Sequence, residues 1–341
     1  MSSKPRVVAL GHPQYAGADY ITEFQKEFNF SVLHATNRAE TQKMLPEDIA
    51  ANGPIDAFLI RMGTPPYEPF DQDLLKALVP DCKIIVSASA GYNEFDVQWM
   101  ADEGIWFCNT VNAVAEATAD MALFLILAVL RNTTNAEKSA RNGTWRAPIG
   151  GGIVPARDPA GLTLGIVGMG AIGKYIAKKA ACFNMKIIYH NRNQLSADEE
   201  ARYGATYCNT LHDLLATSDV VSLSCPLNAN TINLISEAEF AAMKDGVFLV
   251  NTSRGAVVDE KALITALKSG KVARAGLDVF VNEPSPDPWF LQSDKVIIQP
   301  HLGGLTDVAY RKAERECFEN IRALFTKGHA NSPVIEIKAI R

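Results

Sequence analysis

The sequence predicts an α/β protein with two doubly wound, parallel-sheet domains and an active-site cleft between them. Strand-like segments alternate with helical ones in both halves of the chain, the order typical of a parallel sheet. A glycine-rich turn joins a buried strand to a helix at residues 162–181. A length of 341 residues suggests two domains at about 100–200 residues each.

The first half is predicted to hold one such sheet. The helices are expected at 20–28, 38–50 and 71–79, the last stopped by Pro80. The strands are expected at 6–11, 30–34, 55–60 and 83–87. No phosphate-binding glycine pattern follows the first strand, where the chain reads Gly11-His12-Pro13.

The second half is predicted to begin with a long apolar helix at 114–131. The polar stretch 132–159, with Trp145, is too long for an ordinary connection and is interpreted as an arm over a cleft or a partner subunit. Further strands are expected at 185–189, 219–225, 247–251, 274–279 and 295–299, and further helices at 211–216, 236–243, 259–269 and 306–327.

Composition narrows the class of protein. The net charge of −5 argues against nucleic acid and against an anionic membrane surface as partners. The most apolar run, 121–130, is shorter than the roughly 20 residues that a membrane helix needs, and reads as a buried helix. Six scattered cysteines show no metal-ligand spacing and suggest mostly buried thiols. We therefore expect a cytoplasmic protein without a metal site.

The glycine turn reads Gly168-Met169-Gly170-Ala171-Ile172-Gly173. Gly168 allows the tight turn, Gly170 lets a pyrophosphate approach the backbone, and Gly173 lets helix and strand pack closely. The free N–H groups at the helix start favour phosphate oxygens. Because a second strand follows about 20 residues on, a dinucleotide site is favoured over an ordinary strand-to-helix turn.

Four charged side chains lie at the predicted carboxyl ends of strands. Arg254 is placed to bind a carboxylate, or is a surface arginine. Asp278, inside a predicted buried strand, needs a partner such as a cofactor amide or ribose. Glu283 precedes a proline turn and is otherwise a loop-surface residue. His301 is the histidine best placed for acid–base chemistry, and the other five are expected at the surface or as caps.

These segments together resemble the D-isomer-specific 2-hydroxyacid dehydrogenases, the family of glyoxylate/hydroxypyruvate reductase and D-mandelate dehydrogenase. The resemblance runs nearly from end to end. It is carried by the glycine turn, Ala90-Gly91-Tyr92 through Asp96, Ala117-Thr118-Ala119-Asp120, Ser224-Cys225-Pro226-Leu227, Asn251-Thr252-Ser253-Arg254-Gly255, Gly276-Leu277-Asp278-Val279 with Glu283-Pro284, and Pro300-His301-Leu302-Gly303-Gly304.

The resemblance implies an NAD(P)H-dependent reduction of a 2-oxoacid to the D-2-hydroxyacid. Arg254 would polarise the substrate, His301 would donate the proton and Glu283 would keep His301 charged. The backbone N–H groups of Ala90 and Gly91 would hold the carboxylate, with Tyr92 in the substrate pocket. The implied cofactor residues are Gly168, Gly170, Ala171, Ile172, Gly173, Asn191, Arg192, Cys225, Pro226, Thr231, Thr252, Asp278, Gly303 and Thr118.

The family also implies a division of the chain. A substrate domain would comprise 1–111 with 311–341, and a dinucleotide-binding domain 112–310. A homodimer is expected, with helix 114–131 and the Trp145 arm crossing to the partner.

Three departures from the family pattern bear on specificity. Asn191 stands where an acid would bind the ribose 2′-OH, and Arg192 follows, which favours NADPH over NADH unless Arg192 is simply solvent-facing. Gly304 replaces a serine of many relatives and leaves room for a bulky 2-oxoacid. Arg61 lies at the end of a first-domain strand, and it either binds a second anionic group of the substrate or is a charge at the rim of the cleft.

Two other functions remain open on sequence alone. Corepressors that resemble this family sense nucleotides and keep the Arg254, Glu283 and His301 set, although this chain has only a short segment after its last helix. A formate- or phosphite-type dehydrogenase shares the fold, and Glu283 argues against the formate type, which pairs its histidine with a glutamine.

Overall fold

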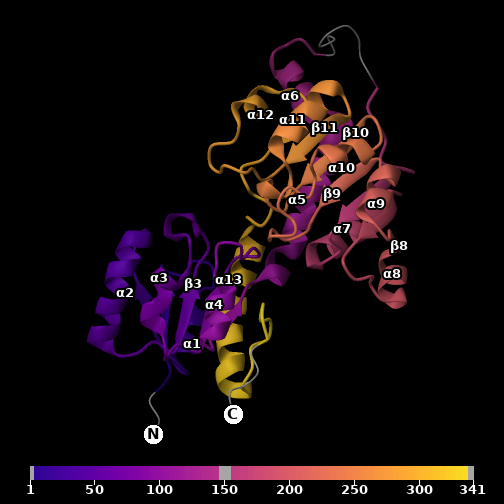
Figure 1. Ribbon diagram of the computed structural model, residues 1–341. Helices are drawn as coiled ribbons and strands as arrows, with labels where there is room; N and C mark the ends of the chain where they lie inside the picture. Colours follow the sequence, from indigo (N-terminus) through magenta and orange to yellow (C-terminus); the bar gives the residue numbers. More distant parts are fainter. Residues whose placement is uncertain (1–3, 146–154, 337–341) are drawn as a thin grey trace. The chain divides into compact units, whose positions relative to one another are not determined.

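Two parallel β-sheets organise the protein, which confirms the predicted α/β class (Figure 1). The computed structural model describes residues 4–145 and 155–336. The chain divides into two compact units. Unit 1 is formed by Met1–Val114 and Leu305–Arg341, and unit 2 by Ala115–Gly304.

Unit 1 has a five-stranded sheet of order β2-β1-β3-β4-β5. Its strands are β1 (Arg6–Leu10), β2 (Asn29–Leu33), β3 (Ala57–Ile60), β4 (Ile84–Ser87) and β5 (Trp106–Cys108). Its helices are α1 (Ala18–Gln25), α2 (Arg38–Asn52), α3 (Gln72–Leu75), α4 (Val97–Asp102) and α13 (Asp307–Lys327), with short 3-10 turns at Pro65–Tyr67 and Lys76–Leu78. The strand order changes direction between β1 and β3: β2 is added on one side of β1, and β3 to β5 are added on the other. Ligands commonly bind at such a point in α/β folds.

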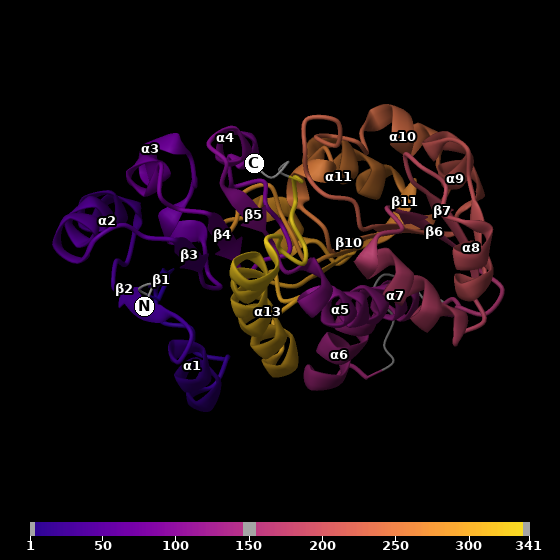
Figure 2. The ribbon, with the colours of Figure 1, turned by 90° about the horizontal axis from the view of Figure 1, so that it is seen from below.

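Helices cover both faces of this sheet (Figure 2). On one face, apolar side chains of α2, α3 and α4 pack on β1, β3 and β4. On the other, α1 and α13 lie together, with Phe24 and Phe318 in edge contact at 4.7 Å between ring centroids. The strands are buried on both faces, which explains their nearly continuous apolar sequences.

Unit 2 has a seven-stranded sheet of order β12-β11-β10-β9-β6-β7-β8. Its strands are β6 (Thr163–Val167), β7 (Lys186–His190), β8 (Ala205–Tyr207), β9 (Val220–Leu223), β10 (Val247–Asn251), β11 (Val272–Leu277) and β12 (Val296–Ile298). Its helices are α5 (Val111–Arg131, which begins in unit 1), α6 (Thr133–Arg141), α7 (Ala171–Ala181), α8 (Ala197–Tyr203), α9 (Leu211–Thr217), α10 (Glu237–Ala242), α11 (Glu260–Ser269) and α12 (Pro288–Gln292), with a 3-10 turn at Gly255–Val257.

The two faces of this sheet carry separate cores. Side chains of α5 and α7 pack on one face, and side chains of α9, α10 and α11 pack on the other. The order reverses between β9 and β6, so the chain segments that follow these two strands meet at the carboxyl edge.

Several predicted elements need correction. The polar stretch 132–159 begins with a helix, α6, while residues 146–154 of the predicted arm lie outside the described residues. The strand predicted at 274–279 ends at Leu277, so Asp278 lies just past it. The helix predicted at 71–79 is the short α3 followed by a 3-10 turn. The short elements α4, β5, α8, β8 and α12 were not predicted.

Helix α5 contains the apolar run 121–130 and is 21 residues long. By length and composition alone it is long and apolar enough to cross a membrane, but 61% of its most apolar window is buried inside the protein. A core helix passes the same test, and α5 supplies Leu125 and Val129 to the core of unit 2. Four of the six cysteines are buried, and Cys182 is exposed.

Candidate active site

The glycine turn follows β6 in unit 2, and each of its glycines has a distinct surrounding. Gly168 has a φ of 97°, and a Cβ there would lie 2.7 Å from the backbone nitrogen of Cys225. A Cβ at Gly173 would lie 2.4 Å from the Gly168 carbonyl oxygen. A Cβ at Gly170 would meet no protein atom within 4 Å. The first and third glycines therefore serve packing, and the second faces open space.

The first turn of α7 offers backbone N–H groups to a ligand. Gly170 is the N-cap residue and provides no side-chain acceptor. In residues 4–145 and 155–336, no acceptor is recorded for the N–H groups of Ala171 and Ile172. Free N–H groups at the positive end of a helix dipole attract phosphate oxygens. This end of α7 can hold a pyrophosphate.

Asn191 follows β7, and its side chain contacts the glycine turn. Its side-chain oxygen accepts a hydrogen bond from the backbone N–H of Met169 at 2.6 Å. The next residue, Arg192, is exposed. The structure thus gives Asn191 a fixed orientation beside the glycine turn, a contact that its sequence position did not reveal.

Two buried hydroxyl groups support the fit of a cofactor to this edge. Ser224 and Thr252 each follow a strand, β9 and β10, and Leu223 pairs with Asn251 in the ladder between them. Their hydroxyl oxygens are buried and have no hydrogen-bond partner among the described residues. A buried polar atom without a partner is unfavourable, so a polar ligand would be favoured here. Ser224 was named in the sequence only as part of a family motif and not as a cofactor residue, although its position next to the end of β9, beside that of Thr252 after β10, was the available signal.

Hydrogen bonds within the loop after β9 hold its conformation. The Thr231 hydroxyl donates to the carbonyl oxygen of Pro226 at 2.7 Å and accepts from the N–H of Asn228 at 2.8 Å. Cys225 is buried, and burial raises the pKa of its thiol to about 11. Thr231, Pro226 and Cys225 therefore all have contacts within the protein, and the Cys225 thiol stays neutral.

His301 and Glu283 form a pair in unit 2. The Nδ1 atom of His301 lies 2.7 Å from Oε2 of Glu283, and both side chains are partly exposed. His301 has a φ of 57°, and its backbone N–H donates to the carbonyl oxygen of Asp278 at 2.8 Å. A positive φ is uncommon for a residue other than glycine and often marks a functional position.

Asp278 fastens the turn that carries His301. Its carboxylate accepts hydrogen bonds from the N–H groups of Leu302 and Gly303 at 2.7 and 2.8 Å. Burial raises the pKa of Asp278, although these two N–H groups oppose the shift. A Cβ at Gly303 would lie 2.8 Å from Asp278 Oδ2 and 3.3 Å from Thr118 Cγ2. The partner that this buried acid requires is therefore the backbone of the His301 turn.

Glu283 is held in its charged form. Burial acts to raise its pKa, but the hydrogen bond with His301, the N–H of Phe280 and the charges of His301 and Arg254 together lower it. The Phe280 N–H donates to Oε1 at 2.9 Å, which leaves Oε2 for His301. A carboxylate in this position orients the imidazole.

Arg254 follows β10 and begins the 3-10 turn Gly255–Val257. Its carbonyl oxygen accepts from the side-chain amide of Asn251 at 3.0 Å, which fixes the backbone. Its Nη1 donates to the carbonyl oxygen of Ser253 at 2.9 Å. The positive charge of Arg254 also helps to lower the pKa of Glu283, so Arg254 lies near the pair of Glu283 and His301.

Ala90 and Gly91 lie in unit 1, on the loop after β4. The carbonyl oxygen of Ala90 accepts from the side chain of Asn109 at 2.7 Å, and that of Gly91 from the Ser89 hydroxyl at 2.9 Å. No acceptor is recorded for the N–H groups of Ala90 and Gly91 within the described ranges. Tyr92, next in the chain, packs against the unit 1 core. Two adjacent free N–H groups can bind a carboxylate.

Comparisons with known proteins agree with this geometry. Residues 123–303 match the family described as "D-isomer specific 2-hydroxyacid dehydrogenase, NAD binding domain". The chain is 59% identical to the dehydrogenase efuE of Hormonema carpetanum over 337 residues, which cover 99% of this chain and 83% of the relative.

Solved structures show the same likeness. A glyoxylate reductase from Paecilomyes thermophila is 37% identical, with a TM-score of 0.90 over 98% of this chain and 99% of that one. The apo form of Rhodotorula graminis D-mandelate dehydrogenase is 34% identical, with a TM-score of 0.86 over 98% and 99% of the two chains. The chain therefore belongs to the D-isomer-specific 2-hydroxyacid dehydrogenase family and is a dehydrogenase, or 2-oxoacid reductase, of that family.

Proposed function

We propose that the protein reduces a 2-oxoacid to the D-2-hydroxyacid with NADPH as its preferred reductant. The observation that carries the proposal is the pair of His301 Nδ1 and Glu283 Oε2, on a turn fastened by Asp278, in the unit that also holds the glycine turn. An imidazole oriented by a carboxylate is suited to donate a proton near neutral pH.

The roles of the residues follow from their contacts. The nicotinamide supplies the hydride when it is bound. Because Nδ1 of His301 faces Glu283, the proton for the substrate oxygen comes from Nε2. Arg254 binds the 2-oxoacid and stabilises the negative charge that develops on its oxygen. The N–H groups of Ala90 and Gly91 bind the substrate carboxylate.

Each part of the cofactor is assigned to residues of unit 2, starting with the glycine turn. Unit 2 binds the dinucleotide, with its pyrophosphate at the start of α7 and its nicotinamide end near the Ser224 and Thr252 hydroxyl groups. Asn191 offers no negative charge to repel a 2′-phosphate, and the exposed Arg192 is free to bind one. Both features favour NADPH over NADH.

The remaining assignments concern substrate and assembly. Unit 1, with α13, is the substrate-binding unit. The absence of a side chain at Gly304 leaves room for a 2-oxoacid larger than glyoxylate or hydroxypyruvate. The protein works as a cytoplasmic homodimer, for which Phe124 on α5 and Trp145 supply large exposed apolar side chains.

Initial rates of NADPH and NADH oxidation test this function. The substrates are glyoxylate, hydroxypyruvate, phenylglyoxylate and 2-oxoisocaproate, with His301→Ala as the control variant. We expect turnover with at least one substrate, faster with NADPH, and its loss in His301→Ala with cofactor binding retained. Tight cofactor binding without turnover on any substrate would favour a nucleotide-sensing role instead.

A further inference from the structure

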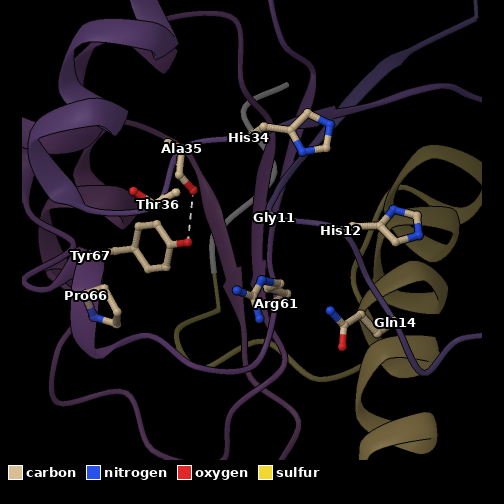
Figure 3. Close-up of a pocket in the computed structure, with 9 residues that line it drawn as sticks. All are labelled: Gly11, His12, Gln14, His34, Ala35, Thr36, Arg61, Pro66 and Tyr67. Atoms are coloured by element: carbon tan, nitrogen blue, oxygen red, sulfur yellow. Dashed lines mark hydrogen bonds between the residues drawn. The ribbon is translucent and has the colours of Figure 1, made fainter.

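Unit 1 contains a polar pocket of about 280 Å³ where the chain leaves the carboxyl ends of β1, β2 and β3 (Figure 3). Its polar and charged lining comes from His12, Gln14, His34, Thr36 and Arg61. Nη1 of Arg61 donates to the carbonyl oxygen of Met62 at 3.0 Å. The pocket lies in the unit that is proposed to bind the substrate, so it implies no additional ligand. Unit 2 holds a hydrogen-bond network that the proposed reaction does not yet explain.

This network begins at the segment 191–196, which joins β7 to α8 and carries Arg192. The side-chain oxygen of Asn191 accepts a hydrogen bond from the N–H of Met169 at 2.6 Å. The carbonyl oxygen of Asn191 accepts another from the hydroxyl of Tyr207, on β8, at 3.1 Å. The residue before Arg192 is therefore fixed to both the glycine turn and the sheet.

Tyr189 of β7 holds the other end of the segment. Its side chain is fully buried, and its hydroxyl accepts a hydrogen bond from the N–H of Leu195 at 2.9 Å. The same hydroxyl donates to Oε1 of Glu200 at 2.7 Å, and the side-chain amide of Gln194 donates to that oxygen at 2.9 Å. Burial and the hydrogen bond with Glu200 raise the pKa of Tyr189 to about 12, so the hydroxyl keeps the proton that it donates. One tyrosine thus ties the end of the segment and the first turn of α8 to the sheet.

The first turn of α8 carries three acids, which would repel a phosphate group bound nearby. Glu199 forms an ion pair with Lys174 of α7, Glu200 accepts the two hydrogen bonds described above, and Asp198 is exposed. By contrast, Arg192 is exposed and forms no ion pair within residues 4–145 and 155–336. The network therefore provides partners for two of the acids and leaves the guanidinium for a ligand.

We propose that Tyr189 is a positioning residue for the choice of cofactor, because its hydroxyl holds the segment 191–196 so that Arg192 faces the 2′-phosphate of NADPH. This role rests on the proposed preference for NADPH, in which Arg192 binds that phosphate. An exposed arginine loses conformational freedom when it binds a ligand, and a backbone that is already fixed reduces this loss. NADH has no 2′-phosphate, so the hydroxyl of Tyr189 should favour NADPH alone.

Dissociation constants of NADPH and NADH, measured from the fluorescence of the reduced nicotinamide, test this role. Tyr189→Phe keeps the buried ring and removes only the hydroxyl. We expect it to weaken NADPH binding by roughly three- to tenfold, as for the loss of a hydrogen bond. NADH binding should be unchanged, because Asn191 keeps its own hydrogen bonds. The control is Tyr203→Phe on α8, where the ring is partly buried and no hydrogen bond of the hydroxyl is recorded in the described part of the chain. It should change neither constant.

Two further variants distinguish positioning from a general effect on the fold. Gln194→Ala removes the second donor to Glu200 by shortening an exposed side chain, so it should fold as wild type does and weaken NADPH binding in the same direction. In an Arg192→Ala background, Tyr189→Phe should have no further effect on NADPH, because the hydroxyl acts through that guanidinium. A merely structural role would weaken both cofactors and would persist in the double variant.

The outcomes separate this role from the proposed function. Equal weakening of NADPH and NADH by Tyr189→Phe, or an undiminished effect in the Arg192→Ala background, would overturn the proposal. If wild type prefers NADPH through Arg192 and Tyr189→Phe changes neither constant, the cofactor preference stands and the role of Tyr189 fails. If wild type binds the two cofactors equally and Arg192→Ala changes neither constant, the proposed preference itself fails, and Tyr189 has no such role.

Discussion

The Nδ1 atom of His301 lies 2.7 Å from Oε2 of Glu283, and the other carboxylate oxygen, Oε1, accepts the backbone N–H of Phe280. Both carboxylate oxygens of Glu283 therefore have a hydrogen-bond partner, the imidazole of His301 for Oε2 and the backbone of Phe280 for Oε1. Burial would raise its pKa, but the hydrogen bonds and the positive charges of His301 and Arg254 lower it below its ordinary value of 4.5. The Glu283 carboxylate should therefore stay ionised in mildly acidic solution.

Replacing Glu283 with glutamine should lower turnover. Glutamine keeps an acceptor for Nδ1 of His301 but removes the negative charge beside the imidazole. We expect kcat for reduction to fall by roughly 10²-fold. Steady-state rates at saturating cofactor and substrate measure this.

The same substitution gives a stability test with a defined sign. Because the folded pKa of Glu283 is lowered, its stabilisation is present above pH 4.5 and is lost as the pH falls through the folded value. The wild-type advantage over Glu283→Gln should therefore shrink below pH 4.5, and it should be at most about 1 kcal/mol because the pair is partly exposed. A constant difference in unfolding free energy from pH 7 to 3 would contradict the ion pair.

The position of Asp278 shows where sequence reasoning stops. Its charge beside a buried strand was evident, and so was its need for a partner. The partners are the N–H groups of Leu302 and Gly303, 24 and 25 residues away, and backbone groups leave no mark in a sequence. The strand also ends two residues earlier than predicted, at Leu277, so Asp278 belongs to the loop that follows.

Substitutions at Asp278 should separate positioning from folding. Asp278→Ala leaves two N–H groups without an acceptor, and each such loss costs about 1–3 kcal/mol. Asp278→Asn keeps one acceptor oxygen and should cost less. Burial raises the pKa of Asp278, so the folded state is destabilised by ionisation as the pH rises above 3.8. The unfolding free energy of Asp278→Asn should therefore come closest to that of wild type at higher pH.

Urea unfolding from pH 4 to 8, with kcat on the same samples, checks both effects. Equal stability of Asp278→Ala and Asp278→Asn would show that the turn does not depend on these hydrogen bonds. A fall in kcat with unchanged stability would instead assign Asp278 to contacts with the cofactor.

The pair of Asn191 and Arg192 should set the choice of cofactor. Asn191→Asp keeps an oxygen for the Met169 N–H and adds the charge that suits a ribose 2′-OH and repels a 2′-phosphate. We expect it to change the NADPH-to-NADH ratio of kcat/KM by about tenfold or more toward NADH, a difference of about 1.4 kcal/mol.

Arg192→Ala serves as the matched test of the neighbouring residue. It should raise the KM for NADPH much more than the KM for NADH, since only the 2′-phosphate needs the guanidinium. Equal effects on the two cofactors would remove Arg192 from the site. Neither result depends on which 2-oxoacid is the substrate.

Other features could not be derived from local sequence because they depend on sheet order. The pocket of unit 1 collects residues that follow β1, β2 and β3, and only the order β2-β1-β3 places His34 and Arg61 on either side of Gly11. By contrast, the glycine turn was predictable because its requirements are local. The segments α4, β5 and α8 are too short for periodicity to identify.

Two glycine substitutions should separate cofactor contact from packing. A Cβ at Gly173 would lie 2.4 Å from a backbone oxygen, so Gly173→Ala must move α7 away from β6 and should destabilise the protein by about 1–3 kcal/mol. A Cβ at Gly170 meets no protein atom within 4 Å, so Gly170→Ala should fold with the stability of wild type. Its methyl group would instead occupy the approach of a pyrophosphate, and its affinity for NADPH should fall. Thermal unfolding and titration with NADPH measure the two effects separately. If Gly170→Ala bound NADPH as tightly as wild type, the pyrophosphate would have to lie elsewhere on unit 2.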